Sequence, residues 1–210
     1  MAEISSMENT TQSRYCPIVF VLGLPGSGKG TLCKLVADQS DISGHRYCHI
    51  STGDYLRELC KSEVSDDTLS FDLNRIRKHL RESKLLPSHV LVPVLEHKIS
   101  SIPKESNATT TWLIDGFPRN METALVFEEK IGKPVKVIVL ECARDVAQHR
   151  FLSRGRERSD DEKLFTRRYE EYVENMKAIR EHYGSALESI CVDGTREESL
   201  AEFIRVLPQN

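Results

Sequence analysis

The residues best suited to chemistry stand in a glycine-rich stretch, GLPGSGKGT, at positions 23–31. Its four glycines permit a tight turn that points successive backbone N–H groups inward, and Lys29 adds a full positive charge. An apolar run at 18–22 precedes the stretch and a helical pattern follows from Thr31. Strand, loop and helix in this order are typical of a phosphate-binding loop. A turn without a ligand explains one or two glycines, but not four with a lysine.

The stretch departs from the general phosphate-loop pattern, which places a hydroxyl directly after the lysine. Here Gly30 follows Lys29, and the hydroxyl comes one residue later. The form GxPGSGKGT resembles the loop of the adenylate kinases and related nucleoside monophosphate kinases. This resemblance implies that ATP is bound by Gly26, Ser27, Gly28, Lys29, Gly30, Thr31, Arg154 and Arg196.

A second chemical group, Asp115, ends an apolar run and leads into Gly-Phe-Pro-Arg at 116–119. Because open α/β sheets bind ligands at the carboxyl ends of their strands, Asp115 is expected at the site. It can hold a water on Mg²⁺, while Arg119 offers a two-pronged fork for phosphate. The run DGFPR resembles the DG[FY]PR signature of the same kinases.

The acceptor end is indicated by STGDYLR at 51–57. It resembles the family's STGDxLR segment, which implies that Thr52 touches the base and Arg57 grips the monophosphate. Taken alone, these residues are better explained as a capping hydroxyl and a solvated arginine, and the glycine loop upstream reverses that preference. By resemblance the monophosphate is bound by Thr52, Arg57, Lys84, Leu85, Leu86, Gly116, Phe117, Pro118, Arg119, Thr123, Arg158 and Arg168.

Two positions at this end differ from the family pattern. Ser83 stands where the family usually has glycine, so this edge is expected to pack differently. Thr123 replaces the Gln or Asn that reads the base, which offers one hydroxyl in place of an amide. The choice of base therefore stays open.

Four arginines gather within the nine residues 150–158 of a net-acidic chain. A solvated basic loop explains them in isolation, but their position after a strand–helix unit favours phosphate binding. The segment resembles a brief form of the family's lid, at 154–161, too short for a zinc-bearing insert. By resemblance the catalytic residues are Lys29, Arg119, Arg154, Arg158 and Arg168, with Arg167 as the alternative to the last.

Composition restricts the class of protein. The chain has 210 residues and a net charge of −3, which suits one core and argues against binding nucleic acid or an anionic membrane. No run approaches the ~18 apolar residues of a membrane span. Six cysteines are scattered without CxxC spacing, so we expect reduced thiols, a cytoplasmic location and no zinc site. None of the seven histidines receives a role.

Five strand candidates alternate with helices and predict an α/β fold: a five-stranded parallel sheet of the P-loop NTPase type with helices on both faces. The candidates are 18–22, 47–50, 112–115, 135–140 and 190–193. Residues 1–15 are expected to be a disordered leader, and 16–210 one kinase domain, with a monophosphate-binding arm at 51–86. An aromatic stripe from Phe165 to Tyr183 recurs at helical spacing and is assigned to packing.

The implied reaction moves the γ-phosphoryl group of MgATP to a nucleoside monophosphate, in a monomer. Thr52 favours AMP, because UMP/CMP kinases usually carry alanine there. Thr123 and Asn120 point instead to a pyrimidine acceptor. Two alternatives remain: a slowly hydrolysing ATP or GTP switch, and a nucleotide-binding module that does not transfer phosphate.

Overall fold

A five-stranded parallel sheet forms the centre of the molecule, in the order β2-β3-β1-β4-β5. The computed structural model describes residues 16–39, 45–61, 71–101, 109–154 and 161–208. The strands are β1 (Ile18–Gly23), β2 (His45–Ser51), β3 (Thr109–Asp115), β4 (Lys136–Glu141) and β5 (Leu187–Cys191). The predicted fold class is confirmed, although β5 begins and ends earlier than the sequence indicated.

The predicted leader and most of the predicted lid, including Arg158, lie outside the described residues.

Strand β1 occupies the middle because it is apolar on both faces. It pairs in parallel with β3 on one side and β4 on the other, so that Val19 lies opposite Leu113 and Lys136. All its residues from Ile18 to Leu22 are buried. A strand covered on both faces needs such a continuous apolar run.

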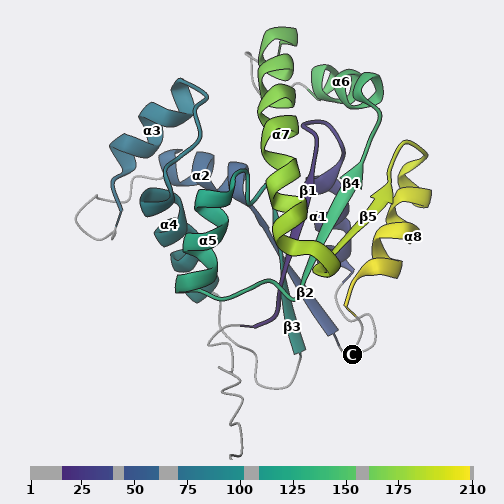
Figure 1. Ribbon diagram of the computed structural model, residues 1–210, viewed down its shortest axis with the longest axis horizontal. Coiled ribbons are helices and arrows are strands. Elements are labelled where there is room, and N and C mark those ends of the chain that lie inside the picture. Colours follow the sequence, from purple (N-terminus) through teal and green to yellow (C-terminus); the bar gives the residue numbers. More distant parts are fainter. Residues whose placement is uncertain (1–15, 40–44, 62–70, 102–108, 155–160, 209–210) are drawn as a thin grey trace, which may run out of the picture.

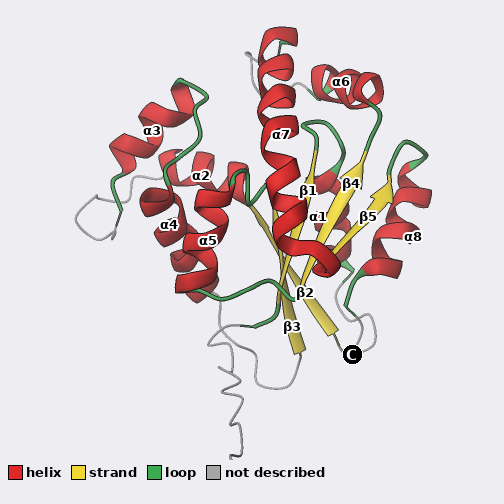
Figure 2. Ribbon diagram, viewed as in Figure 1, coloured by secondary structure: helices red, strands yellow, loops and turns green. Residues whose placement is uncertain are grey.

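Helices cover both faces of the sheet (Figure 1). Helices α1 and α8 lie on one face, and α4, α5 and α7 lie on the other, as Figure 2 shows with helices in red and strands in yellow. The helices are α1 (Lys29–Asp38), α2 (Thr52–Lys61), α3 (Leu73–Arg81), α4 (Ser88–Ser101), α5 (Met121–Lys130), α6 (Arg144–Ser153), α7 (Glu162–Tyr183) and α8 (Arg196–Val206), with a 3₁₀ turn, η2 (Gly184–Ala186).

Alternate residues of β1 build the two halves of the core. Phe20 packs edge-on against Phe117 and Phe127, with ring centroids 5.2 Å away in both cases. Val19 faces the other side, where it packs with α1 and α8. Each aromatic pair contributes about 0.5–1.5 kcal/mol beyond the burial of its area. This packing fixes the strand end from which the glycine loop departs.

Three helices stand at the acceptor end. Helix α4 begins directly after Pro87, whose carbonyl accepts hydrogen bonds from the amides of Val90 and Leu91. Helix α3 buries Leu73 and Ile76. Together α2, α3 and the start of α4 stand to one side of the sheet, beyond the carboxyl end of β2 (Figure 1).

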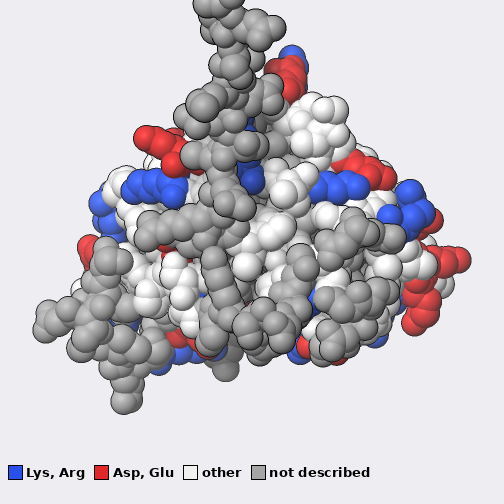
Figure 3. All heavy atoms as spheres, turned by 90° about the horizontal axis from the view of Figure 1, so that it is seen from below, with Lys and Arg blue, Asp and Glu red and all other residues white. Residues whose placement is uncertain are grey.

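Charge is mixed on the side of the molecule opposite to the carboxyl ends of the strands. Lys and Arg are interspersed with Asp and Glu over the described atoms of this side (Figure 3). None of the described helices combines the length and the apolar composition needed to cross a bilayer.

Candidate functional site

The loop between β1 and α1 owes its path to glycines with positive φ. Gly26 has φ 90°, and a Cβ there would lie 2.0 Å from the carbonyl oxygen of Ala147 in α6. Gly28 has φ 91° and forms the N-cap of α1 without any side-chain cap. The first N–H groups of α1 are therefore left for a ligand, and an anion suits them best. The Ser27 hydroxyl is also buried and has no partner among the described residues.

Lys29 is held by the loop itself. Its Nζ donates to the carbonyl oxygens of Gly23, at 2.9 Å, and Leu24, at 2.8 Å. Burial lowers the pKa of Lys29 to about 8; the carboxylate of Asp115 opposes this shift, while Arg119 and Arg154 add to it. These groups come from four different segments, so the loop lies where a carboxylate and several cations converge.

A cleft of about 1120 Å³ opens in front of the loop, at the carboxyl ends of the strands. Most of the residues predicted to bind nucleotides line it: Gly26, Ser27, Gly28, Lys29, Gly30, Thr31, Thr52, Arg57, Lys84, Leu85, Leu86, Asp115, Gly116, Pro118, Arg119, Thr123, Arg154, Arg168 and Arg196. Phe117 does not line it, because its ring is fully buried against Phe20. The structure thus brings residues together that are as far apart in the chain as Gly26 and Arg196, a separation of 170 positions.

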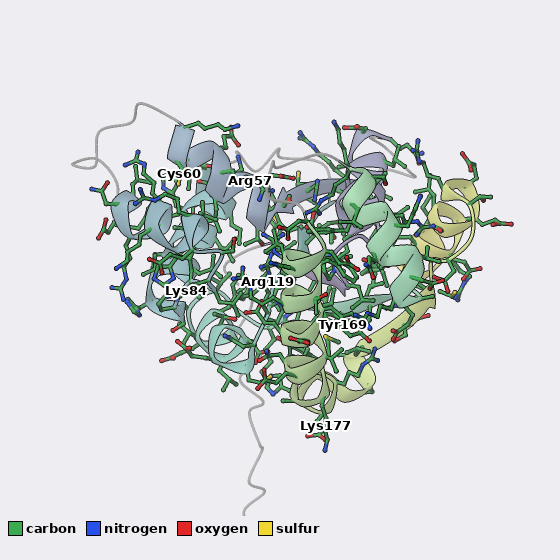
Figure 4. The ribbon with its side chains drawn as sticks, turned by 90° about the horizontal axis from the view of Figure 1, so that it is seen from above. Arg57, Cys60, Lys84, Arg119, Tyr169 and Lys177 are labelled. Carbon is green, nitrogen blue, oxygen red and sulfur yellow. The ribbon has the colours of Figure 1, made fainter. Side chains whose placement is uncertain are left out.

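The arginines reach the cleft from several elements. Figure 4 looks onto the carboxyl ends of the strands and shows Arg119 near the centre, with Arg57 and Lys84 on the side of α2 and α3. Arg119 Nε donates to the carbonyl oxygen of Gly116 at 3.2 Å, which leaves both terminal nitrogens of its fork for other partners. Arg57 pairs with Asp54 one turn before it.

Two further arginines are held by an aromatic ring. The Arg154 guanidinium lies 4.0 Å from the centroid of Phe151, and that of Arg168 lies 5.9 Å from the same ring. Stacking of this kind fixes the plane of a guanidinium. Arg168 lines the cleft, whereas Arg167 donates to the carbonyl oxygen of Ser83, at 3.0 Å. Of the two candidates, Arg168 is therefore the one at the cleft.

Asp115 is 7% exposed and receives a hydrogen bond from His49, with Nε2 2.5 Å from Oδ2. The other carboxylate oxygen remains for the cleft. One carboxylate together with phosphate oxygens and waters is a donor set that Mg²⁺ accepts, so the residues present fit this ion.

Thr52 and Thr123, the two positions expected to contact the base, differ in the hydrogen bonding of their hydroxyl groups. Thr52 is buried, and its hydroxyl has no hydrogen-bond partner among the described residues. The Thr123 hydroxyl instead lies 3.0 Å from the carbonyl oxygen and 2.9 Å from the Oδ1 of Asn120, at the start of α5. The Thr52 hydroxyl therefore has no described partner at the wall of the cleft, whereas the Thr123 hydroxyl is bound to Asn120, the N-cap residue of α5.

Several lining residues were not assigned individually to the site by the sequence. Arg150 donates to the carbonyl oxygens of Val192, at 2.7 Å, and Gly194, at 3.1 Å, which holds the turn after β5. Its spacing of four from Arg154 was the signal that could have placed it. Tyr172 and Met176 also line the cleft, so the stripe on α7 does more than pack. Periodicity cannot separate these two uses, because both lie on the buried face of a helix.

Comparison with known proteins decides the family. The sequence profile of the adenylate kinase family, described as "Adenylate kinase", matches residues 21–187. The chain belongs to the adenylate kinase family. It is a nucleoside monophosphate kinase, and ATP with a monophosphate are the substrates expected of this family.

Relatives within the adenylate kinase family carry two different substrate names. "UMP-CMP kinase 3" of Oryza sativa subsp. japonica is 33% identical over 85% of this chain and 78% of its own length. "UMP-CMP kinase" of Lentinula edodes is 32% identical over 91% of this chain and 84% of its own length. "Adenylate kinase isoenzyme 5" of Homo sapiens is 32% identical over 88% of this chain, which covers 31% of that protein.

Proposed function

We propose that this kinase transfers the γ-phosphoryl group of ATP, bound with Mg²⁺, to AMP and so forms two ADP. The observation that carries the choice of AMP is Thr52, a residue that lines the cleft and whose buried hydroxyl has no hydrogen-bond partner among the described residues. A buried hydroxyl left unpaired costs about 1–3 kcal/mol, and a bound base offsets that cost. The family's adenylate kinases carry threonine here, whereas its UMP/CMP kinases usually carry alanine.

The phosphates of ATP lie on the amides of the glycine loop in this proposal, and Lys29 binds the outer ones. Lys29 exchanges the carbonyl oxygens of Gly23 and Leu24 for phosphate oxygens when ATP arrives. Arg154 and Arg196 complete this end of the site. Burial lowers the pKa of Lys29, and the negative charge of a bound phosphate raises it again.

Arg57 and Arg119 hold the phosphate of the acceptor, and Arg154 and Arg168 bind the group in transfer. Arg158 joins them in the proposal, although it lies outside the described residues. Two anions repel each other, so the main tasks of these arginines are alignment and charge neutralisation. The acceptor phosphate is already a nucleophile, and none of the steps needs a general base.

In this proposal Asp115 holds Mg²⁺ through a water. It uses the carboxylate oxygen that is not hydrogen-bonded to His49. When bound with ATP, Mg²⁺ would neutralise part of the charge of the phosphates. His49 in turn fixes the plane of the Asp115 carboxylate. We also propose that the protein is a monomer and that it is cytoplasmic; the location is supported by its six cysteines, which are all free thiols.

The test is a comparison of acceptors. We expect ADP formation from ATP to have its highest kcat/KM with AMP, relative to UMP and CMP. Thr52→Ala should lower kcat/KM for AMP by about two- to tenfold, the value of one neutral hydrogen bond, and leave UMP nearly unchanged. Thr123→Val is the control, because that hydroxyl is already bound to Asn120 and its loss should not change the ranking.

A second candidate is a UMP/CMP kinase, favoured by Asn120 at the cleft and by the names of the rice and Lentinula relatives. It predicts that UMP or CMP exceeds AMP in kcat/KM and that Thr52→Ala changes all three acceptors alike. Either result overturns AMP as the preferred acceptor.

A further inference from the structure

A thiol, an imidazole and a carboxylate meet beneath the cleft. They belong to Cys33 on α1, His49 on β2 and Asp115 on β3, and their ligating atoms all lie within 4.8 Å of one another. Three elements that are distant in sequence therefore bring three different metal-binding groups to one point. The phosphate chemistry proposed above uses the carboxylate, which His49 orients, and leaves the thiol without a role.

The sheet register explains why they meet. His49 pairs with Leu113, and Asp115 lies two residues further along β3, so both point to the same face of the sheet. That face is the one covered by α1, on which Cys33 is fully buried. The cluster is thus held by the central sheet and a packed helix.

Sulfur, nitrogen and oxygen donors in one cluster match Zn²⁺ better than Mg²⁺. Zinc binds thiolate at about 2.3 Å and imidazole or carboxylate at about 2.0–2.2 Å, so the atoms of a tetrahedral site lie roughly 3–4 Å apart. The distances here need to change by about 1 Å to reach that arrangement. Mg²⁺ prefers oxygen donors throughout and has little affinity for a thiol.

We propose that Cys33, His49 and Asp115 form a binding site for Zn²⁺, separate from the magnesium of the kinase reaction, and that its occupation inhibits the enzyme. Asp115 borders the cleft, so water from the cleft supplies the fourth ligand. Zinc takes the carboxylate that the reaction needs, and therefore acts as an inhibitor. The site itself stands on the cluster geometry, while its inhibitory effect rests on the proposed role of Asp115.

Binding exchanges protons for the metal without any redox change. The S–H bond of Cys33 breaks, a Zn–S bond forms, and the proton passes to water. The proton on Nε2 of His49, which is hydrogen-bonded to Asp115, is exchanged through water to Nδ1, so that Nε2 binds the metal as a neutral imidazole. Burial raises the pKa of the Cys33 thiol well above its ordinary value, so only a metal with high thiolate affinity displaces this proton. The ammonium of Lys29 near Asp115 further opposes a cation, which makes the site reversible.

The test uses Co²⁺ as a spectroscopic probe of the full-length, metal-free protein without nucleotide. We expect one equivalent to bind, with the visible bands of tetrahedral cobalt and a thiolate-to-cobalt charge-transfer band in the near ultraviolet. Cys33→Ser should remove the charge-transfer band and weaken Zn²⁺ binding by at least about 100-fold, more than the 10–100-fold typical of losing an outer-shell contact. Cys191→Ser, at an exposed cysteine, is the matched control and should keep the band.

A charge-transfer band that persists in Cys33→Ser, or octahedral cobalt without a sulfur band in the wild type, overturns the site. Circular dichroism and ADP formation without zinc show that Cys33→Ser is folded, since Cys33 has no part in the reaction. If that variant fails to fold, His49→Gln takes its place in the cobalt titration and should lose the tetrahedral bands.

Inhibition is the second measurement. With MgATP in excess, Zn²⁺ should inhibit ADP formation by the wild type, and Cys33→Ser should need at least about tenfold more zinc for the same loss. Equal sensitivity of the two proteins overturns the inhibitory role. The acceptor assay described above is run without zinc, so a failure there leaves the metal site intact and the two proposals can be separated.

Discussion

The two ends of the cleft are formed by different chemical groups, the backbone at one end and side chains at the other. At the glycine loop the backbone makes the site: Gly26 and Gly28 have positive φ angles, and the helix start without a side-chain cap leaves N–H groups for a ligand. At the acceptor end side chains make it, including Thr52 and Arg57. Backbone groups recognise a phosphate chain whatever its base, whereas side chains can be exchanged one by one. The comparison indicates that phosphate binding is fixed by geometry and that acceptor choice is the adjustable property.

The largest effect is expected from removing the charge of Lys29 while the geometry of the loop is kept. Lys29→Met should keep the fold and lower turnover by at least about 10³-fold, because one preorganised charge at the transition state is worth about 3–4 kcal/mol. Steady-state ADP formation measures the loss, and circular dichroism checks the fold. Lys34→Met, at an exposed position of the same helix, is the control. Near-normal turnover in Lys29→Met would remove this residue from the mechanism.

The next prediction compares two loop glycines. Gly26→Ala places a Cβ 2.0 Å from the Ala147 carbonyl oxygen, and should lower the free energy of unfolding by roughly 3 kcal/mol or more. Gly28→Ala has a similar φ but meets nothing within 4 Å, so it should lose only about 1–2 kcal/mol. Denaturant titration of both variants measures the difference. Equal losses would mean that the contact with α6 does not constrain the loop.

A third test uses pH. Lys29 in the free enzyme has a pKa of about 8, so nucleotide binding should weaken by up to about tenfold for each pH unit above 8. Calorimetric titration with a non-hydrolysable ATP analogue measures this. Lys29→Arg, which stays charged, should give a flatter profile.

The same pKa predicts an opposite trend in stability. An ordinary lysine keeps its proton to about 10.5, so between pH 8 and 10.5 the unfolded chain binds more protons than the native one. The contribution of Lys29 to the free energy of unfolding should therefore rise with pH across this range.

The smallest expected effect lies at the acceptor end. Ser83 has φ 49°, which costs a non-glycine residue about 1 kcal/mol. Ser83→Gly removes this strain but adds freedom to the unfolded chain, so we expect a change of no more than about 1 kcal/mol in stability. Thermal unfolding detects it. A large loss would show that the Ser83 side chain, and not only its carbonyl contact with Arg167, supports this edge.

Sequence patterns predicted a residue's place in the structure wherever a pattern has only one structural explanation. The apolar run of β1, the glycines of the loop and the strand-end position of Asp115 all predicted their places in the structure. They failed where one pattern serves two purposes. Phe117 sits inside a binding motif yet packs in the core, because the chain turns its ring away from the cleft.

The cysteine spacing gave no indication of the cluster at Cys33. CxxC pairs are local, whereas Cys33, His49 and Asp115 meet only through strand register and the packing of α1. Likewise the capping role of Thr123 depends on the turn before α5, which the sequence did not reveal. Contacts of this kind require knowledge of which strands are neighbours.

The close approach of Gly26 to the carbonyl of Ala147 has a mechanical consequence. The loop packs directly against the backbone of α6, the helix whose C-cap residue is Arg154. Any adjustment that a triphosphate imposes on the loop is therefore passed to the base of that helix. We expect arrival of the donor nucleotide to reposition the arginine that meets the transferred group, so that substrate capture and catalytic alignment occur as one movement.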